Sequence, residues 1–171
     1  MIPTFIAGLM LYFPYLWCYW KKEDLERYGL KWRLTKNDVL LVALLTLITL
    51  IPLTFISRCW PGQSLPRQVN GSKIFALLVT GLVAAVVEET FFRGWLQTMF
   101  RKMLGPLLAI VITALVFGLA HTFMGLHFLR FATFFPGLIM GYLKERTGNV
   151  FPSICYHFFG NVWSIWFFPD L

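Results

Sequence analysis

Charged side chains are scarce in this 171-residue chain, where they make up 13% of the residues. Soluble domains carry roughly 25%. Long polar stretches are also missing, and there is no internal repeat and no low-complexity segment. With 58% hydrophobic residues and a mean hydropathy of +0.68, the composition excludes a water-soluble domain. It predicts an all-α integral membrane protein.

Six apolar windows, separated by short polar breaks, predict a polytopic bundle of about six transmembrane helices. Each is long enough for the roughly 20 residues that cross a bilayer. The third is longer, so it is expected to tilt or to emerge at one end. Nearly all of residues 1–171 is accounted for, so we expect a single membrane domain with a motif-bearing core at about 74–168. The windows are Ile2–Trp20, Asp38–Ile56, Ile74–Phe100, Pro106–Phe123, Leu126–Leu143 and Val150–Phe168.

The first window lacks the basic start and the small-residue cleavage site of a signal peptide. Aromatic residues Trp17, Tyr19 and Trp20 stand at its end instead, which is typical of a retained helix with an interfacial aromatic belt. Cysteine is rare as well. The three cysteines form no CxxC pair and no even-numbered framework, so buried thiols are expected.

Acidic residues are fewer than basic ones, and the net charge is +7. Ten basic residues fall in the first, third and fifth loops, against Arg58, Arg67 and Lys73 on the opposite side. The positive-inside rule then predicts cytoplasmic loops and both termini outside, as in a prokaryotic inner membrane. The first loop, which mixes acids and bases, is expected to be an interfacial amphipathic segment. No nucleic-acid partner is expected, although a nucleic-acid-binding basic patch is the alternative.

Two adjacent carboxylates, Glu88 and Glu89, follow the uncharged apolar run 74–87. An ionised carboxylate in hydrocarbon costs several kcal/mol, so such residues are rare and usually functional. Glu89 and Arg93 are four residues apart, in the favourable order for an ion pair on one helix face. Glu88 is turned from Glu89 by about 100° and is left unmatched, which favours a general base pointing into the bundle. The alternative is a purely structural Glu89–Arg93 pair.

The fourth window carries His121, with Phe117 one helical turn earlier on the same face. Gly118 and Ala120 are small and would let another backbone approach closely. Taken alone, His121 fits a packing role as well as a catalytic one.

The sixth window carries His157 and Asn161, four residues apart and therefore on one helix face. Gly160, between them, is also expected to permit close approach of another helix. Interhelical hydrogen bonding is the alternative for both side chains. His121 lies near the outer end of its window and His157 near the inner end of its own, so the depth of a shared site is left open.

The polar side chains of three windows could together form one hydrolytic site. A carboxylate and a histidine can activate water, and a second histidine with an amide can donate to a developing oxyanion. These are the parts of a hydrolase that uses water directly, without a serine or cysteine nucleophile. The set is Glu88, Glu89, Arg93, His121, His157 and Asn161.

Three motifs at these residues resemble those of the CPBP family. They are Glu88-Glu89-x-x-x-Arg93-Gly94, Phe117-x-x-x-His121 and His157-x-x-x-Asn161. The family comprises the CAAX-protease and bacteriocin-processing (Abi) intramembrane endopeptidases and includes the Rce1-like prenyl proteases. The linking stretch from Phe135 to Val150 is also similar, so the likeness runs from Val86 to Asn161.

This resemblance implies an intramembrane peptidase of the glutamic type. Glu88 would be the general base, and His121 would help to hold and activate the water. His157 and Asn161 would form the oxyanion hole. Three further residues would shape the site: Glu89, Arg93 and Phe117.

Metal ligation is another way to use these side chains, because glutamate and histidine can both bind zinc. Zinc sites usually gather three or four His, Cys or carboxylate ligands, whereas the third motif supplies Asn161, a poor ligand. The HExxH pattern is absent as well. We therefore expect no metal and no other cofactor, with zinc kept as the alternative.

The expected partners are the lipid bilayer and a membrane-anchored protein or peptide substrate. Members of the family that this chain resembles cut prenylated proteins near the C-terminus or process membrane-anchored tails. The small bundle is also similar to the myxosortase-like branch, which processes C-terminal sorting tails, so a tail helix is the expected substrate. A prenylated CAAX peptide is the second candidate. A non-catalytic bacteriocin-immunity protein or a proton-coupled carrier is a further alternative, although a carrier would be expected to show a repeat or broken helices.

Overall fold

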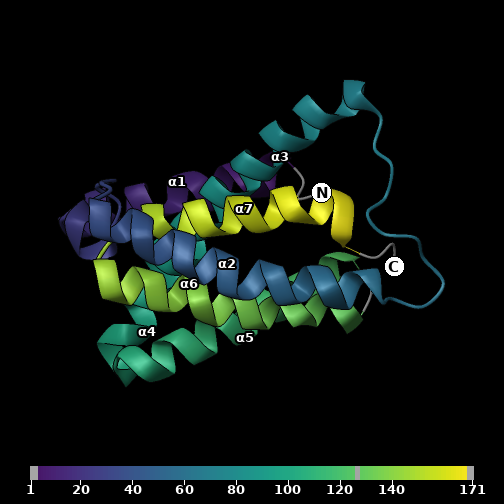
Figure 1. Ribbon diagram of the computed structural model, residues 1–171. Helices are drawn as coiled ribbons and strands as arrows, with labels where there is room; N and C mark the ends of the chain where they lie inside the picture. Colours follow the sequence, from purple (N-terminus) through teal and green to yellow (C-terminus); the bar gives the residue numbers. More distant parts are fainter. Residues whose placement is uncertain (1–3, 126–127, 169–171) are drawn as a thin grey trace.

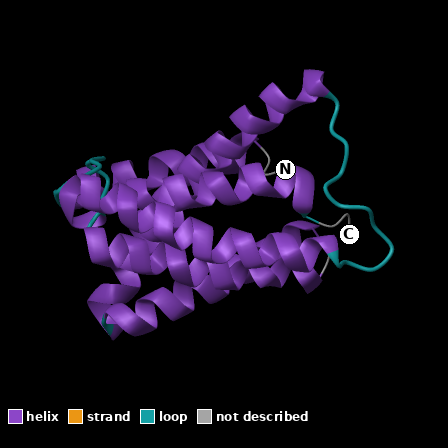
Figure 2. Ribbon diagram, in the orientation of Figure 1, coloured by secondary structure: helices purple, strands orange, loops and turns teal. Residues whose placement is uncertain are grey.

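The structure is a computed structural model that describes residues 4–125 and 128–168, and these residues contain no β-strand. Six helical rods run alternately in opposite directions along one bundle (Figure 1). Figure 2 shows the same bundle with its loops confined to the two ends. The predicted all-α bundle is therefore confirmed. The helices are α1 (Thr4–Lys21), α2 (Lys36–Arg58), α3 (Gly71–Glu89), α4 (Gln97–Leu104), α5 (Pro106–Gly125), α6 (Phe134–Thr147) and α7 (Phe151–Phe167).

Each predicted window falls on one rod, although the starts of the first and fifth windows lie outside the described residues. The fifth window is not one regular helix as expected. A 3₁₀ helix, Phe128–Thr133 (η3), precedes the 14-residue α6. Pro136 stands in the first turn of α6, where a helix tolerates proline because the missing N–H has no partner there. The α-helical part of this rod is therefore short for a bilayer span.

Within the described residues, two rods are long and apolar enough to cross a membrane: α2 and the continuous helix Gly71–Leu104, which has 34 residues. Only 6% of the apolar window of α2 is buried within the bundle. Its outer face exposes large apolar side chains such as Leu40, Ile48 and Phe55. Monomeric soluble proteins rarely expose so continuous an apolar face, so these surfaces are suited to contact with lipid.

The third rod contains a π-helical segment, Thr90–Leu96 (η2), between α3 and α4. In a π-helix the hydrogen bonds reach one residue further than in an α-helix, and such segments are frequently found at functional sites. Nothing in the sequence pattern predicted this segment. The N-terminal part of α3 leans away from the bundle at the upper right of Figure 1, and its tilt in a bilayer stays a prediction.

The first loop packs part of its apolar surface into the bundle, and its position at the membrane interface stays a prediction. Its 3₁₀ helix, Leu25–Tyr28 (η1), buries Tyr28 completely, and the Lys102 ammonium donates to the Tyr28 hydroxyl at 2.8 Å. Leu30 packs where Gly94 has no side chain, since a Cβ on Gly94 would lie 2.8 Å from Leu30 Cδ2. Leu30 thus packs on the π-helical segment, whereas Trp32 and Leu34 of the same loop are exposed.

The three loops that carry the excess of basic residues lie at one end of the bundle, on the left of Figure 1. Asn149 links the fifth loop to the first by hydrogen bonds. Its Nδ2 donates to the carbonyls of Lys31 and Arg33, both at 3.1 Å. Its Oδ1 accepts from the Phe151 N–H two residues on, at 2.8 Å, which forms a turn just before α7. The cytoplasmic location of this end stays a prediction from the charge distribution.

Candidate active site

Glu88 and Glu89 end α3, and both residues are buried, with exposed fractions of 6% and 0% for the whole residue. Glu89 has a partner at each oxygen: its Oε1 accepts from His157 Nδ1 at 2.9 Å, and its Oε2, which has no hydrogen bond among the described residues, lies 3.2 Å from Arg93 Nε as an ion pair. The expected Glu89–Arg93 pair is therefore present. Glu88 Oε2 has no hydrogen-bond partner among the described residues. The two neighbouring carboxylates thus have different environments.

His121 approaches Glu88 from α5, with its Nε2 3.6 Å from Glu88 Oε2. Its Nδ1 lies 3.0 Å from the carbonyl oxygen of Phe117. A carbonyl oxygen only accepts, so Nδ1 carries the hydrogen, and in the neutral ring Nε2 presents its lone pair towards Glu88. A separation of 3.6 Å is too long for a direct hydrogen bond, but two acceptors at that separation can share a bridging water.

His157 approaches the same carboxylate from α7. Its Nδ1 donates to Glu89 at 2.9 Å, because a carboxylate only accepts, and its Nε2 lies 3.9 Å from Glu88 Oε2. The sequence left the relative depth of His121 and His157 open. The structure brings both rings to one carboxylate.

Phe117 forms the wall between these groups. Its ring centroid lies 4.3 Å from that of His121 and 5.8 Å from that of His157. The Arg93 guanidinium carbon lies 4.3 Å from the ring centroid, close enough for a cation–π contact. Arg93 is fully buried, and its Nη2 donates to the carbonyl of Gly137 at 3.2 Å. Phe117 thus packs against three of the polar side chains, and its packing fixes their spacing.

Asn161 faces α3 two helical turns before the glutamates, where its Nδ2 donates to the Gly81 carbonyl at 2.9 Å. Glycine makes this contact possible, since a Cβ on Gly81 would lie 3.2 Å from Asn161 Cβ. The expectation for Gly160 is wrong, because open space surrounds its Cβ position. Gly118 does receive a close neighbour, the Phe131 carbonyl, at 3.2 Å from its Cβ position. Of the predicted site residues, Asn161 is the one set apart from the Glu88 group.

No group of three or more His, Cys, Asp and Glu side chains in the described part of the chain is arranged to hold a metal ion. Glu88 Oε2 does lie near two histidine nitrogens, 3.6 Å from His121 Nε2 and 3.9 Å from His157 Nε2. The remaining histidine, His127, lies outside the described residues.

Several contributors to the site were not found from the sequence. The Glu89–His157 contact depends on how α3 and α7 are rotated against each other, which a single sequence does not record. The contact of Arg93 with α6 could have been predicted from the sequence. Gly137 and Gly141 are four residues apart, a spacing that lets helices approach closely. That spacing lies in the stretch similar to the CPBP link between the last two motifs.

A protein-family comparison covers this region of the chain. The family model described as type II CAAX prenyl endopeptidase Rce1-like matches residues 70–163, more than half of the chain. No curated protein and no solved structure matches the chain. The matched segment begins at Asn70, which caps α3, and ends within α7, so it includes Glu88, His121, His157 and Asn161. The chain therefore belongs to the Rce1-like family of CAAX-type endopeptidases, which are membrane proteases that act on membrane-associated proteins.

Proposed function

We propose that this protein hydrolyses a peptide bond of a membrane-anchored protein with a water molecule that Glu88 and His121 activate. The observation that carries the proposal is the state of Glu88. Its carboxylate is buried, its Oε2 has no hydrogen-bond partner among the described residues, and it faces two histidine nitrogens. A buried carboxylate oxygen without a hydrogen bond lowers stability, and membrane proteins retain such groups where function needs them.

Glu88 acts as the general base in this mechanism. The water oxygen attacks the scissile carbonyl carbon while Glu88 takes one of the water protons and His121 Nε2 accepts a hydrogen bond from the other. The carbon–nitrogen bond then breaks, and Glu88 returns its proton to the leaving nitrogen. The products are a carboxylic acid and an amine, and the enzyme is regenerated.

His157 and Asn161 supply the donors for the developing oxyanion. His157 Nδ1 already donates to Glu89, so its Nε2 donates only when the ring carries both hydrogens. The Glu89 carboxylate stabilises that imidazolium, and Arg93 balances the charge of the carboxylate at 3.2 Å. Asn161 has two amide hydrogens and donates one of them to the Gly81 carbonyl. The second hydrogen would donate to the oxyanion from the turn of α7 that follows His157.

We place the approach of the substrate on the His121 side of the site. The side chain of His121 is 26% exposed, compared with 10% for His157 and 8% for Glu88. A scissile carbonyl that arrives from this side meets the water between Glu88 and His121 first.

We take residues 1–171 as one protease domain, because the two helices before the motifs pack on the helices that carry them. On α1, the Phe13 ring meets the Trp95 ring of the π-helical segment with centroids 4.8 Å apart. On α2, Thr49 receives a hydrogen bond from the Tyr156 hydroxyl of α7 at 3.1 Å.

The substrate that we propose is the C-terminal membrane anchor or sorting tail of a membrane protein, cut near the edge of the bilayer. A regular helix keeps its carbonyls in hydrogen bonds, so the tail must unwind locally before cleavage. Glycine, proline or small polar residues near the cleaved bond would lower the cost of unwinding. A prenylated CAAX peptide is the second candidate, favoured by the description of the matching family.

Purified protein in detergent micelles tests both candidates, with the products read by mass spectrometry. One substrate set carries a tail helix in which the glycine, proline or small polar residues near the cleaved bond are either kept or replaced by leucine. The other is a short CAAX peptide with or without its prenyl group, and Glu88→Gln protein serves as the blank. Cleavage that slows on leucine replacement supports the tail. Cleavage that depends only on the prenyl group supports the CAAX peptide. If neither substrate set is cleaved, the result favours the non-catalytic alternatives, a carrier or an immunity protein.

A further inference from the structure

A row of matched polar contacts joins the third rod to α6, between the catalytic centre and the end where the basic loops gather. Arg93 Nη2 donates to the Gly137 carbonyl at 3.2 Å, and Gln97 Nε2 donates to the Gly141 carbonyl at 3.0 Å. Both pairs are 44 residues apart in the chain, so the two helices run parallel and in register. The last pair, again one turn further along each helix, is Arg101 Nε with Glu145 Oε2, at 3.0 Å.

Glycine on α6 brings the two carbonyls within reach. A Cβ on Gly141 would lie 2.9 Å from Ile110 Cγ2 and 3.0 Å from Gln97 Oε1, and a Cβ on Gly137 would lie 3.3 Å from Arg93 Nη2. Each carbonyl oxygen has two lone pairs and can accept from the other helix as well as from its own. The spacing of the glycines therefore sets where α4 can lie against α6.

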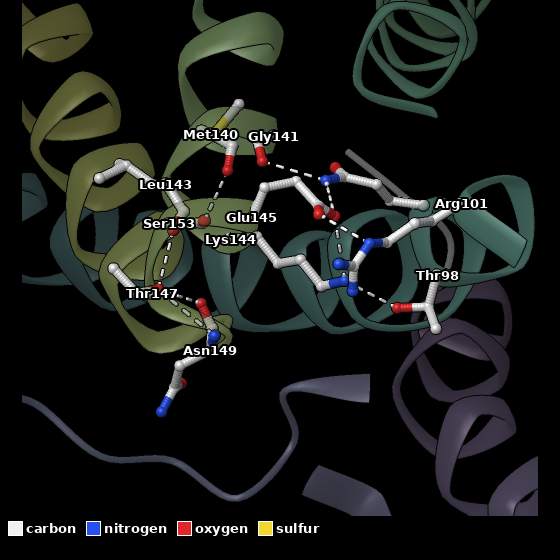
Figure 3. A network of polar contacts seen from close by, with 11 residues as sticks. Thr98, Arg101, Met140, Gly141, Leu143, Lys144, Glu145, Thr147, Asn149 and Ser153 are labelled. Atoms are coloured by element: carbon white, nitrogen blue, oxygen red, sulfur yellow. Dashed lines mark hydrogen bonds and ion pairs between the residues drawn. The ribbon is translucent and has the colours of Figure 1, made fainter. Parts of the chain in front are cut away.

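Gln97 is the buried centre of the row, with an exposed fraction of 0%. Its Nε2 donates to both Gly141 and Glu145, each at 3.0 Å, so both amide hydrogens are used. Lys144 lies beside it, buried, and donates to the Thr98 hydroxyl at 2.9 Å (Figure 3). A buried, hydrogen-bonded amide is costly to disrupt, so the two bonds that Gln97 donates to α6 oppose sliding of α4 along α6.

The row reaches the catalytic centre through its first member. Arg93 pairs with Glu89 at 3.2 Å, and Glu89 holds the His157 ring at 2.9 Å. We propose that Gln97 is a positioning residue that fixes the register of α4 on α6 and thereby sets the place of Arg93, Glu89 and His157. Its catalytic consequence rests on the proposed function. A displacement of about 1 Å at a reacting group can cost about a hundredfold in rate, so such a residue acts without touching the substrate.

Two neighbouring substitutions on α4 test this positioning role. Gln97→Met keeps the volume of the side chain and removes both donors to α6. Thr98→Val is the matched control, because it also removes a buried hydrogen bond to α6 but does not belong to the row. The chain has three histidines, so nitrogen-15 labelling of histidine gives few signals, which single histidine substitutions assign.

We expect Gln97→Met to shift the resonance of His157 Nδ1 and to lower kcat about tenfold, equivalent to ~1.4 kcal/mol, with KM nearly unchanged. Thr98→Val should lower the midpoint of thermal unfolding, leave the His157 resonance in place and leave kcat close to that of the parent. An unmoved His157 resonance in Gln97→Met, or equal shifts in both variants, would overturn the proposal.

The resonance comparison needs no substrate, so it decides the positioning role even if the protein cleaves nothing that is offered. If Gln97→Met does not fold, Gly141→Ala disturbs the same contact from α6, because its Cβ would meet Gln97 Oε1 at 3.0 Å. The same shift of His157 is then expected, and its absence counts against the proposal in the same way.

Discussion

Glutamine at position 88 should stop turnover without unfolding the protein, because it keeps the shape of the side chain and removes its charge. Glu88 is 6% exposed, and its Oε2 has no hydrogen-bond partner among the described residues. The substitution therefore breaks no hydrogen bond of that atom, and it relieves a desolvation cost of several kcal/mol. The midpoint of thermal unfolding of Glu88→Gln should equal or exceed that of the parent.

The rate should fall steeply in the same variant. An amide cannot take a proton from water at neutral pH, and a positioned general base contributes about 10²–10⁴-fold to a rate. We expect kcat to fall by about 10³-fold, which corresponds to ~4 kcal/mol of lost transition-state stabilisation.

Glu89→Gln is the matched control, because it makes the same chemical change one residue away. Glu89 is paired with Arg93 at 3.2 Å and with His157 at 2.9 Å, and breaking a buried ion pair costs about 3–5 kcal/mol. Both variants would be purified in one detergent, with unfolding followed by the fluorescence of the seven tryptophans and cleavage by mass spectrometry. Equal unfolding midpoints for the two variants, or turnover by Glu88→Gln near that of the parent, would refute the reasoning.

His121→Ala should also lose turnover by about 100-fold or more, because the lone pair that holds the water is removed, and a cleavage rate within tenfold of the parent would contradict its role. Extensive chelation should leave activity unchanged and elemental analysis should find little zinc, whereas one tightly bound zinc per chain that restores lost activity would reverse the mechanism. In intact cells, cysteines at the exposed positions Lys31 and Arg146 should be shielded from an impermeant thiol reagent, and one at Ser64 should be labelled, on a background without native cysteines. Labelling at Lys31 would invert the topology.

The helices could be predicted from the sequence because the thickness of the bilayer sets their length, and each predicted window falls on one rod. The Glu89–Arg93 pair was equally accessible, since the α-helical period alone puts residues four apart on one face. Which histidine meets which carboxylate depends on the relative rotation of α3, α5 and α7. That rotation is fixed by packing across the whole bundle, so the sequence left it open.

The π-helical segment was missed for a different reason. Its residues Phe91, Phe92 and Trp95 are large and apolar, as are most residues of the windows, so no periodicity distinguishes a hydrogen bond to the fifth residue from one to the fourth. The buried Lys144 and Gln97 were missed because a charged or amide side chain at the end of a window fits the membrane interface as well as the interior.

The π-helical segment also makes the third rod sensitive to length as well as to composition. The glutamates before it face α5 and α7, while Gln97 after it faces α6. Each residue of an α-helix advances about 100°, so deletion of one residue within 90–96 would turn everything after it by about that angle. The glutamates would then still face α5 and α7, but Gln97 would no longer face α6, although every contacting side chain would still be present. Substitutions of the large apolar residues Phe91 and Trp95 can be absorbed by repacking, whereas a gain or loss of one residue cannot.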